Sequence, residues 1–144
     1  MTATANSFRE TDVMPPADEL VDVSIRGRIA AGGPIETQEI DLGQVPVAKG
    51  LLRGRGGYAL EVDGRSMIEA GIEDGDYVII RQQAWADEGD IVVARMGGEC
   101  TLKRFFYEDN HFRLEPENED MEPIHVTVGE FRIQGKVIGV LKEL

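Results

Sequence analysis

Ser66 and Lys103 are the two residues of this chain whose types could together carry out a covalent reaction. A serine hydroxyl attacks a carbonyl carbon only when a base removes its proton, and a neutral lysine amine can be that base. Upstream of both lies the Ala31-Gly32 bond, in a short apolar stretch that also contains a second glycine and a proline. Small residues let a backbone enter a narrow site, and glycine permits unusual dihedral angles. Together these elements predict a chain that cuts its own Ala31-Gly32 bond.

Lys103 can act as a base near neutral pH only if its pKa falls. The pKa of free lysine is about 10.4, so the amine is normally charged, and burial in apolar surroundings lowers that value. Thr101 and Phe105 lie on the same face of its strand-like run, so an aromatic ring packs that face. A pKa near 7 would require about 4 kcal/mol. The common alternative for a strand lysine is a side chain that extends to solvent.

Ser66 lies between a strand-like run and a short helical pattern, where a turn would expose its hydroxyl. Backbone N–H groups at the start of such a helix could stabilise an oxyanion. The local alternative for Ser66 is an ordinary helix N-cap. The alternative for Ala31-Gly32 is a plain turn. The local patterns leave both alternatives open.

The elements that must position these residues are mostly β. Short β-branched runs bounded by turn residues predict a compact, mostly antiparallel β domain with at most one or two short helical turns. Gly97-Gly98 is typical of a two-residue hairpin connection. Helical turns are expected at Ser66–Gly71 and near Gln82–Trp85. The expected strands are Leu20–Ile25, Tyr58–Val62, Tyr77–Ile80, Ile91–Met96, Glu99–Tyr107, Phe112–Leu114 and Phe131–Leu141.

Charge and composition exclude several classes of function. The formal net charge of −12 argues against a domain that grips nucleic acid or an anionic membrane by itself. A single cysteine, Cys100, excludes an intramolecular disulfide and fits the cytoplasm; it is expected to be a buried or edge thiol. The sequence has neither an apolar run of about 20 residues nor a signal peptide pattern. A cytoplasmic location is therefore expected.

No cofactor or metal site is predicted. His111 and His125 are isolated in the sequence, lack metal-ligand spacing and are expected to be ordinary surface histidines. The acidic run Glu115–Glu122 is interpreted as a solvated loop rather than a cation site. Trp85 is expected to be a partly buried core or interface residue.

Several segments resemble the LexA repressor family, whose catalytic domain is an S24-type peptidase. Gly27–Ile35 resembles the family's cleavage region, and Gly64–Asp76 resembles its nucleophile segment. Gly89–Ala94, Thr101–Arg104 and Arg132–Gly139 resemble the rest of the catalytic domain. The resemblance covers residue 20 to the C-terminus in consistent order and spacing, which is far more specific than any single motif.

The resemblance implies a serine peptidase that cleaves itself, with Ser66 as nucleophile, Lys103 as general base and Ala31-Gly32 as the bond that is cut. It implies a small, mostly β fold that forms a homodimer through its C-terminal region. It also implies that RecA filaments on single-stranded DNA promote the cleavage, which relieves repression of DNA-damage (SOS) genes.

Residues 1–19 are polar and lack periodicity, which predicts a flexible arm or linker remnant. The resemblance implies a cleavage-site region at 20–48 and a Ser-Lys catalytic and dimerisation core at 49–144. LexA repressors carry a winged helix-turn-helix domain before the cleavage region, and the residues before Ala31 are too few for one. Binding to DNA would need that domain. A repressor fragment is therefore expected, and the alternatives are a short UmuD-like subunit of error-prone DNA synthesis or a non-catalytic β interaction module.

Overall fold

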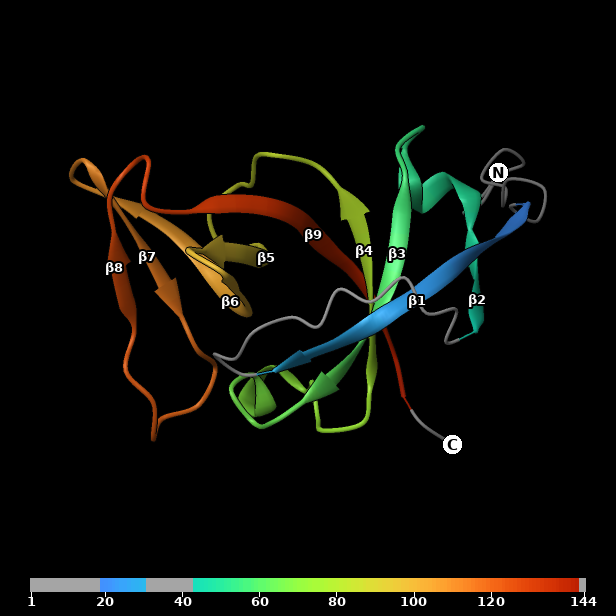
Figure 1. Cartoon of the computed structure of the whole chain (residues 1–144), viewed down its shortest axis with the longest axis horizontal. Helices are drawn as coiled ribbons and strands as arrows, with labels where there is room; N and C mark the ends of the chain where they lie inside the picture. Colours follow the sequence, from blue (N-terminus) through green and yellow to red (C-terminus); the bar gives the residue numbers. More distant parts are fainter. Residues whose placement is uncertain (1–18, 31–42, 143–144) are drawn as a thin grey trace, which may run out of the picture.

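Strands dominate the computed structural model, which describes residues 19–30 and 43–142. Nine strands form one mixed sheet within these residues (Figure 1). The strands are β1 (Leu20–Ala30), β2 (Gln44–Ala48), β3 (Gly57–Asp63), β4 (Tyr77–Gln82), β5 (Ile91–Met96), β6 (Glu99–Glu108), β7 (His111–Glu115), β8 (Ile124–Val126) and β9 (Arg132–Leu141). The predicted mostly β fold is confirmed.

The two short helical elements are 3-10 turns, η1 (Lys49–Leu52) and η2 (Ile68–Ala70). The second lies inside the expected turn at Ser66–Gly71. The turn expected near Gln82–Trp85 is wrong, because β4 continues to Gln82 and non-helical chain follows. In the part of the chain that the structure describes, no helix has the length and apolar character needed to cross a bilayer.

The order of strands in the sheet is β2-β1-β3-β4-β9-β5-β6-β7-β8. Neighbouring strands run antiparallel except β1 and β3, whose parallel pairing makes the sheet mixed. The long strand β9 pairs with β4 through one part and with β5 through another. In Figure 1, β9 crosses the molecule between the group β1–β4 and the group β5–β8.

Strand β1 is longer than the sequence predicted. Its inward positions alternate through Val23, Ile25, Gly27 and Ile29, and all four are buried. The visible apolar alternation stops at Ile25 because Gly27 has no side chain. Gly27 has a φ of 140°, and the pairing of β1 with β3 shifts register between Ile25 and Arg28. The strand continues past this irregularity to Ala30.

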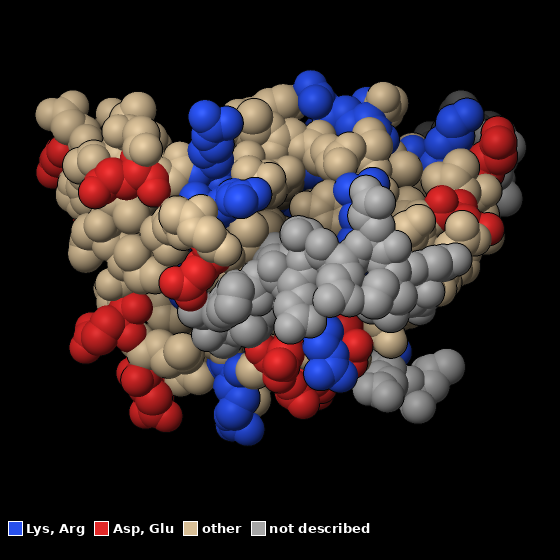
Figure 2. Space-filling view, viewed as in Figure 1, with Lys and Arg blue, Asp and Glu red and all other residues tan. Residues whose placement is uncertain are grey.

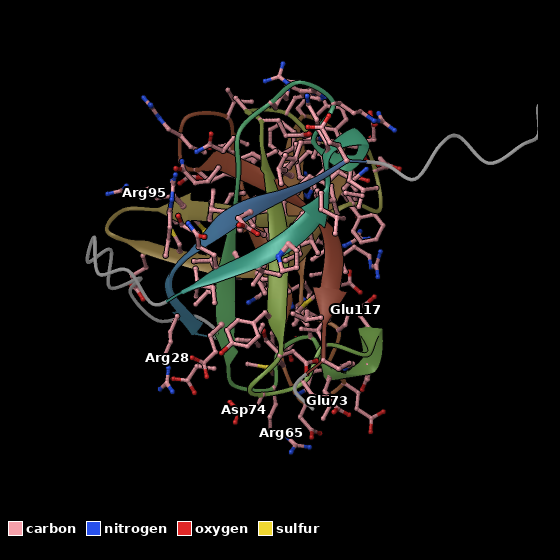
Figure 3. The ribbon with its side chains drawn as sticks, turned by 90° about the vertical axis from the view of Figure 1, so that its right-hand side faces the viewer. Arg28, Arg65, Glu73, Asp74, Arg95 and Glu117 are labelled. Atoms are coloured by element: carbon pink, nitrogen blue, oxygen red, sulfur yellow. The ribbon has the colours of Figure 1, made fainter. Side chains whose placement is uncertain are left out.

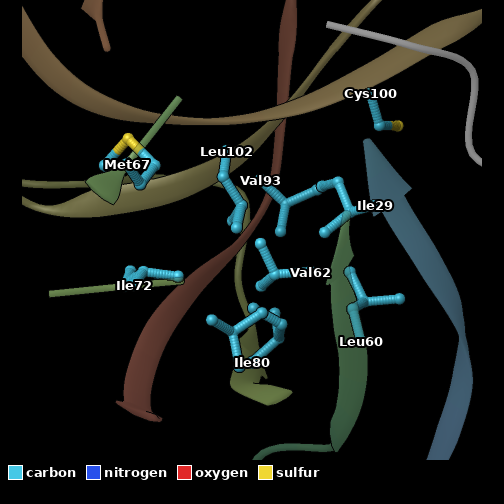
Figure 4. Close-up of a cluster of buried hydrophobic side chains, with 10 residues drawn as sticks. Ile29, Leu60, Val62, Met67, Ile72, Ile80, Val93, Cys100 and Leu102 are labelled. Carbon is cyan, nitrogen blue, oxygen red and sulfur yellow. The ribbon is translucent and has the colours of Figure 1, made fainter. Parts of the chain in front are cut away.

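Two hydrophobic clusters flank strand β6. The first contains Ile29 of β1 together with Met67 and Leu102 (Figure 4). The second is built around Phe105, which stacks on Phe112 with ring centroids 5.5 Å apart. Successive side chains of a strand point to opposite faces, so β6 contributes to both clusters. This double packing buries the middle of β6.

Gly135 of β9 occupies a place where no side chain fits. An added Cβ would lie 2.4 Å from Ile80 Cγ2 and 2.7 Å from the carbonyl oxygen of Arg81. We predict that Gly135→Ala lowers the free energy of unfolding by about 1–3 kcal/mol, because overpacking displaces the neighbouring strand. Chemical denaturation measures this change.

Gly98→Ala is the matched control for that substitution. Gly98 lies in the β5–β6 turn, and an added Cβ meets no atom within 4 Å. We expect a change within about 0.5 kcal/mol there. Equal effects of the two substitutions would contradict the close approach of β9 to β4.

Candidate active site

Ser66 lies in the turn that leaves β3, but it is buried, with 4% of its surface exposed, so the expected exposure of its hydroxyl is wrong. Gly64, the residue after β3, has a φ of 118°, and its N–H donates to Asp74 Oδ1 at 2.9 Å. The following 3-10 turn has Met67 as its N-cap and no side-chain capping bond. Ser66 is therefore not the N-cap, and the local alternative for this residue is wrong.

Figure 3 shows how the turn is placed. Arg65, Glu73 and Asp74 lie at the same end of the molecule, and Arg65 points away from it. Arg28, near the end of β1, lies towards that end too, whereas Arg95 of β5 lies far from it. The segment that carries Ser66 and the end of β1 therefore share one end of the molecule.

Lys103 is buried in the middle of β6, with 3% of its surface exposed. Its Nζ donates to Thr101 Oγ1 at 2.5 Å and to the carbonyl oxygen of Leu102 at 3.2 Å. Within the described residues its amine has no carboxylate partner. Burial lowers the pKa of Lys103 to about 8, since removal from water disfavours the charged amine. The alternative of a solvent-exposed strand lysine is wrong.

Glu117 joins the segments that carry Ser66 and Lys103. Its backbone N–H donates to the carbonyl oxygen of Ser66 at 2.7 Å. Its carboxylate accepts a hydrogen bond from Arg104 Nε at 2.6 Å, and Arg104 directly follows Lys103. The fold therefore ties together two segments that are far apart in the sequence.

The Ala31-Gly32 bond lies outside the described residues, but the strand that leads to it is placed. The last residue of β1, Ala30, pairs with Asp63 at the end of β3, shortly before Ser66 in the sequence. Ile29 is buried in the same cluster as Met67 and Leu102, the sequence neighbours of Ser66 and Lys103. Strand β1 also contacts β6. Strand β1 therefore ends beside the segments that carry Ser66 and Lys103, one residue before the predicted Ala31-Gly32 bond.

The structure gives little support to Cys100 as a nucleophile or to the histidines as metal ligands. Cys100 is buried, as expected, and burial raises the pKa of its thiol, with Arg95 opposing. His111 and His125 are not isolated, because His125 Nδ1 lies 3.3 Å from His111 Nε2. Among the residues that the structure places, no group of three or more His, Cys, Asp or Glu side chains could hold a metal ion.

Trp85 is 50% exposed and so partly buried, and the Arg55 guanidinium lies over its ring at 4.3 Å from the centroid. One sequence interpretation needs correction. The acidic run Glu115–Glu122 is more than a solvated loop, because Glu117 and Asn118 bond to the Ser66 segment. No local pattern marks these two residues, since their contacts join chain segments about 50 residues apart.

The class of protein to which this fold and candidate site belong follows from comparison with known families. A family model described as Peptidase S24-like matches residues 23–138. The match covers most of the chain, so this protein belongs to the Peptidase S24-like family.

The curated relatives extend this assignment. The chain is 51% identical over 127 residues to the LexA repressor of Geobacillus kaustophilus, covering 87% of this chain and 60% of the relative. It is 45% identical over 126 residues to the LexA repressor of Ruminiclostridium cellulolyticum, covering 88% and 58%. It is 42% identical over 146 residues to that of Sorangium cellulosum, covering 99% and 64%. The chain therefore spans about three fifths of the length of these relatives.

The lowered pKa of Lys103 predicts a stability that depends on pH. Between about 8 and 10.5 the unfolded lysine binds more protons than the folded one, so folding becomes more favourable as pH rises. We compare the chain with Lys103→Met, both carrying Ser66→Ala to prevent reaction. Across this window, the free energy of unfolding of the chain with Lys103 should rise by up to about 3 kcal/mol relative to that of the chain with Lys103→Met. A constant difference in the free energy of unfolding from pH 7 to 10.5 would contradict the burial of an ionisable amine.

Proposed function

We propose that this chain is the self-cleaving serine peptidase domain of a LexA-like repressor of the SOS response. Ser66 is the nucleophile, Lys103 is the general base, and the Ala31-Gly32 bond is cut. The observation that carries the proposal is the buried Lys103 amine, whose pKa of about 8 leaves a useful fraction neutral near physiological pH.

The surroundings of Lys103 suit a base. Thr101 Oγ1 and the Leu102 carbonyl oxygen fix the direction of Nζ without supplying a negative charge. A neighbouring carboxylate would raise the pKa and hold the proton on the amine. Neutral hydrogen-bond acceptors therefore orient the amine and still leave it able to accept a proton.

The reaction is an intramolecular acyl transfer. Neutral Lys103 takes the hydroxyl proton of Ser66, and the Ser66 oxygen attacks the Ala31 carbonyl carbon. The tetrahedral intermediate collapses, the bond to the Gly32 nitrogen breaks, and protonated Lys103 supplies the proton to the leaving amine. Water, deprotonated by Lys103, then hydrolyses the ester on Ser66 and releases the Ala31 carboxylate. Lys103 returns the proton taken from water to the departing Ser66 oxygen, so the serine hydroxyl and the neutral base are both regenerated.

Tethering makes this reaction efficient, and the docking equilibrium of the cleavage loop restrains it. A bond in the same chain has a high effective concentration at the site, so modest catalytic machinery suffices. Restraint comes from an equilibrium between a docked and an undocked cleavage loop that favours the undocked state. RecA filaments on single-stranded DNA act by binding the docked state preferentially.

The names of the relatives support the repressor role over a UmuD-like role. On this proposal the protein acts in the cytoplasm as a homodimer formed through its C-terminal region. Val140 and Leu141 at the end of β9 are exposed, which suits a dimer contact. DNA is bound only through a winged helix-turn-helix domain outside this chain. Figure 2 shows acidic side chains interspersed with basic ones on the face in view, which suits a domain that does not grip DNA itself.

Intact-mass spectrometry tests the proposal. We expect the chain to yield fragments 1–31 and 32–144 at about pH 10, and to react far more slowly at pH 6, where Lys103 is protonated. Ser66→Ala should stay intact at both values. Lys103→Arg should also stay intact, because a guanidinium does not lose its proton.

Different outcomes would point elsewhere. A chain that stays intact even with activated RecA would refute the self-cleaving function. Cleavage that persists in Ser66→Ala would assign the reaction to another group or to a contaminating peptidase.

A further inference from the structure

The loop that connects β7 and β8, residues 116–123, lies along the segment that carries Ser66. The N–H of Glu117 donates to the carbonyl oxygen of Ser66 at 2.7 Å, and the N–H of Glu69 donates to the carbonyl oxygen of Glu117 at 2.8 Å. These two bonds form a short backbone ladder. The backbone of Ser66 is therefore held from outside its own turn.

Side chains reinforce the ladder at both ends. Asn118 Nδ2 donates to the carbonyl oxygen of Arg65 at 2.9 Å. The N–H of Glu119 donates to the carboxylate of Glu69 at 2.8 Å. Asn118 Oδ1 in turn accepts from the N–H of Asp120 at 2.9 Å, which holds the amide in a fixed orientation. Consecutive carbonyl groups, those of Arg65 and Ser66, are thus bonded to consecutive loop residues.

The same loop is anchored to the strand of Lys103. The carboxylate of Glu117 accepts from Arg104 Nε at 2.6 Å, and both side chains are largely shielded from solvent, at 29% and 26% exposure. Arg104 also donates to the carbonyl oxygen of Gly89, so the guanidinium is braced from a second side. Charge-assisted hydrogen bonds of this kind are the stronger ones in proteins. A continuous path of bonds therefore runs from the Ser66 backbone through Glu117 to the residue after Lys103.

We propose that Glu117 and Asn118 are positioning residues that set the place of Ser66 relative to Lys103. This inference rests on the proposed roles of Ser66 as nucleophile and Lys103 as general base. Ser66 sits in a turn, and Lys103 sits on a strand from a different part of the chain, so their relative position needs a physical tie. A displacement of about 1 Å at reacting groups can cost a hundredfold in rate. The Glu117–Arg104 pair supplies that tie, and Asn118 fixes the turn.

The test measures self-cleavage of the full chain as a function of pH in Glu117→Ala and Asn118→Ala. Each should lower the plateau rate at high pH by about 10- to 100-fold. The pH midpoint should stay that of the unaltered chain, because the partners of Lys103 Nζ lie on its own strand. A midpoint that moves, or a plateau rate that does not fall, would overturn the positioning role.

Two further variants separate positioning from general loosening. Glu117→Gln should recover much of the rate, since an amide oxygen still accepts from Arg104 Nε. Glu122→Ala removes an exposed carboxylate of the same loop and should leave the rate within about twofold. A Glu122→Ala loss equal to that of Glu117→Ala would overturn the proposal, because any change in the loop would then suffice.

The outcomes also separate this inference from the function beneath it. An unaltered chain that never cleaves overturns both together. An unaltered chain that cleaves, with Glu117→Ala and Asn118→Ala equally fast, overturns the positioning role alone. If Glu117→Ala does not fold, Asn118→Ala carries the same comparison of plateau rate and midpoint.

Discussion

The burial of one lysine amine, which has no carboxylate partner among the described residues, is the constraint on which the candidate site depends. Burying a charged ammonium is costly, and a protein reduces that cost by releasing the proton. Among the residues that the structure places, Lys103 Nζ bonds to Thr101 Oγ1 and the Leu102 carbonyl oxygen, and burial lowers its pKa to about 8. A salt bridge to a carboxylate would have stabilised the charged amine and kept it protonated, so that it could not act as a base. The proposed chemistry therefore depends on a fold that holds Lys103 where its charged form is disfavoured.

That position is held by packing on both sides of β6. Leu102 belongs to one buried cluster and Phe105 to the other, so the strand cannot turn Lys103 out to solvent without disrupting both. Ile29, near the end of β1, belongs to the same cluster as Leu102. The strand that leads to the Ala31-Gly32 bond is therefore packed in the same core. The hydrophobic core and the proposed chemistry are therefore coupled through neighbouring residues of three chain segments.

The sequence predicted what depends on local pattern and missed what depends on distant contacts. The Gly97-Gly98 hairpin and the strand carrying Lys103 follow from period-two alternation and turn residues, and the structure has both. Strand β2 was missed because Pro46 argues against a strand, although an edge position tolerates it. The three-residue β8 is too short to give a pattern. Glu117 and Asn118 were interpreted as solvated, because their bonds to the Ser66 turn are invisible before the chain folds.

The most direct test of the central claim is a titration of Lys103 itself. Carbon-13 NMR of labelled lysine side chains, in the Ser66→Ala chain, follows the four lysines of the sequence separately, and Lys103→Arg assigns the signal by its loss. The account predicts that this signal titrates near pH 8, well below the usual lysine value of about 10.4. A Lys103 signal that titrates with the other lysines near 10.4 would show an ordinary charged amine and would contradict the proposed base.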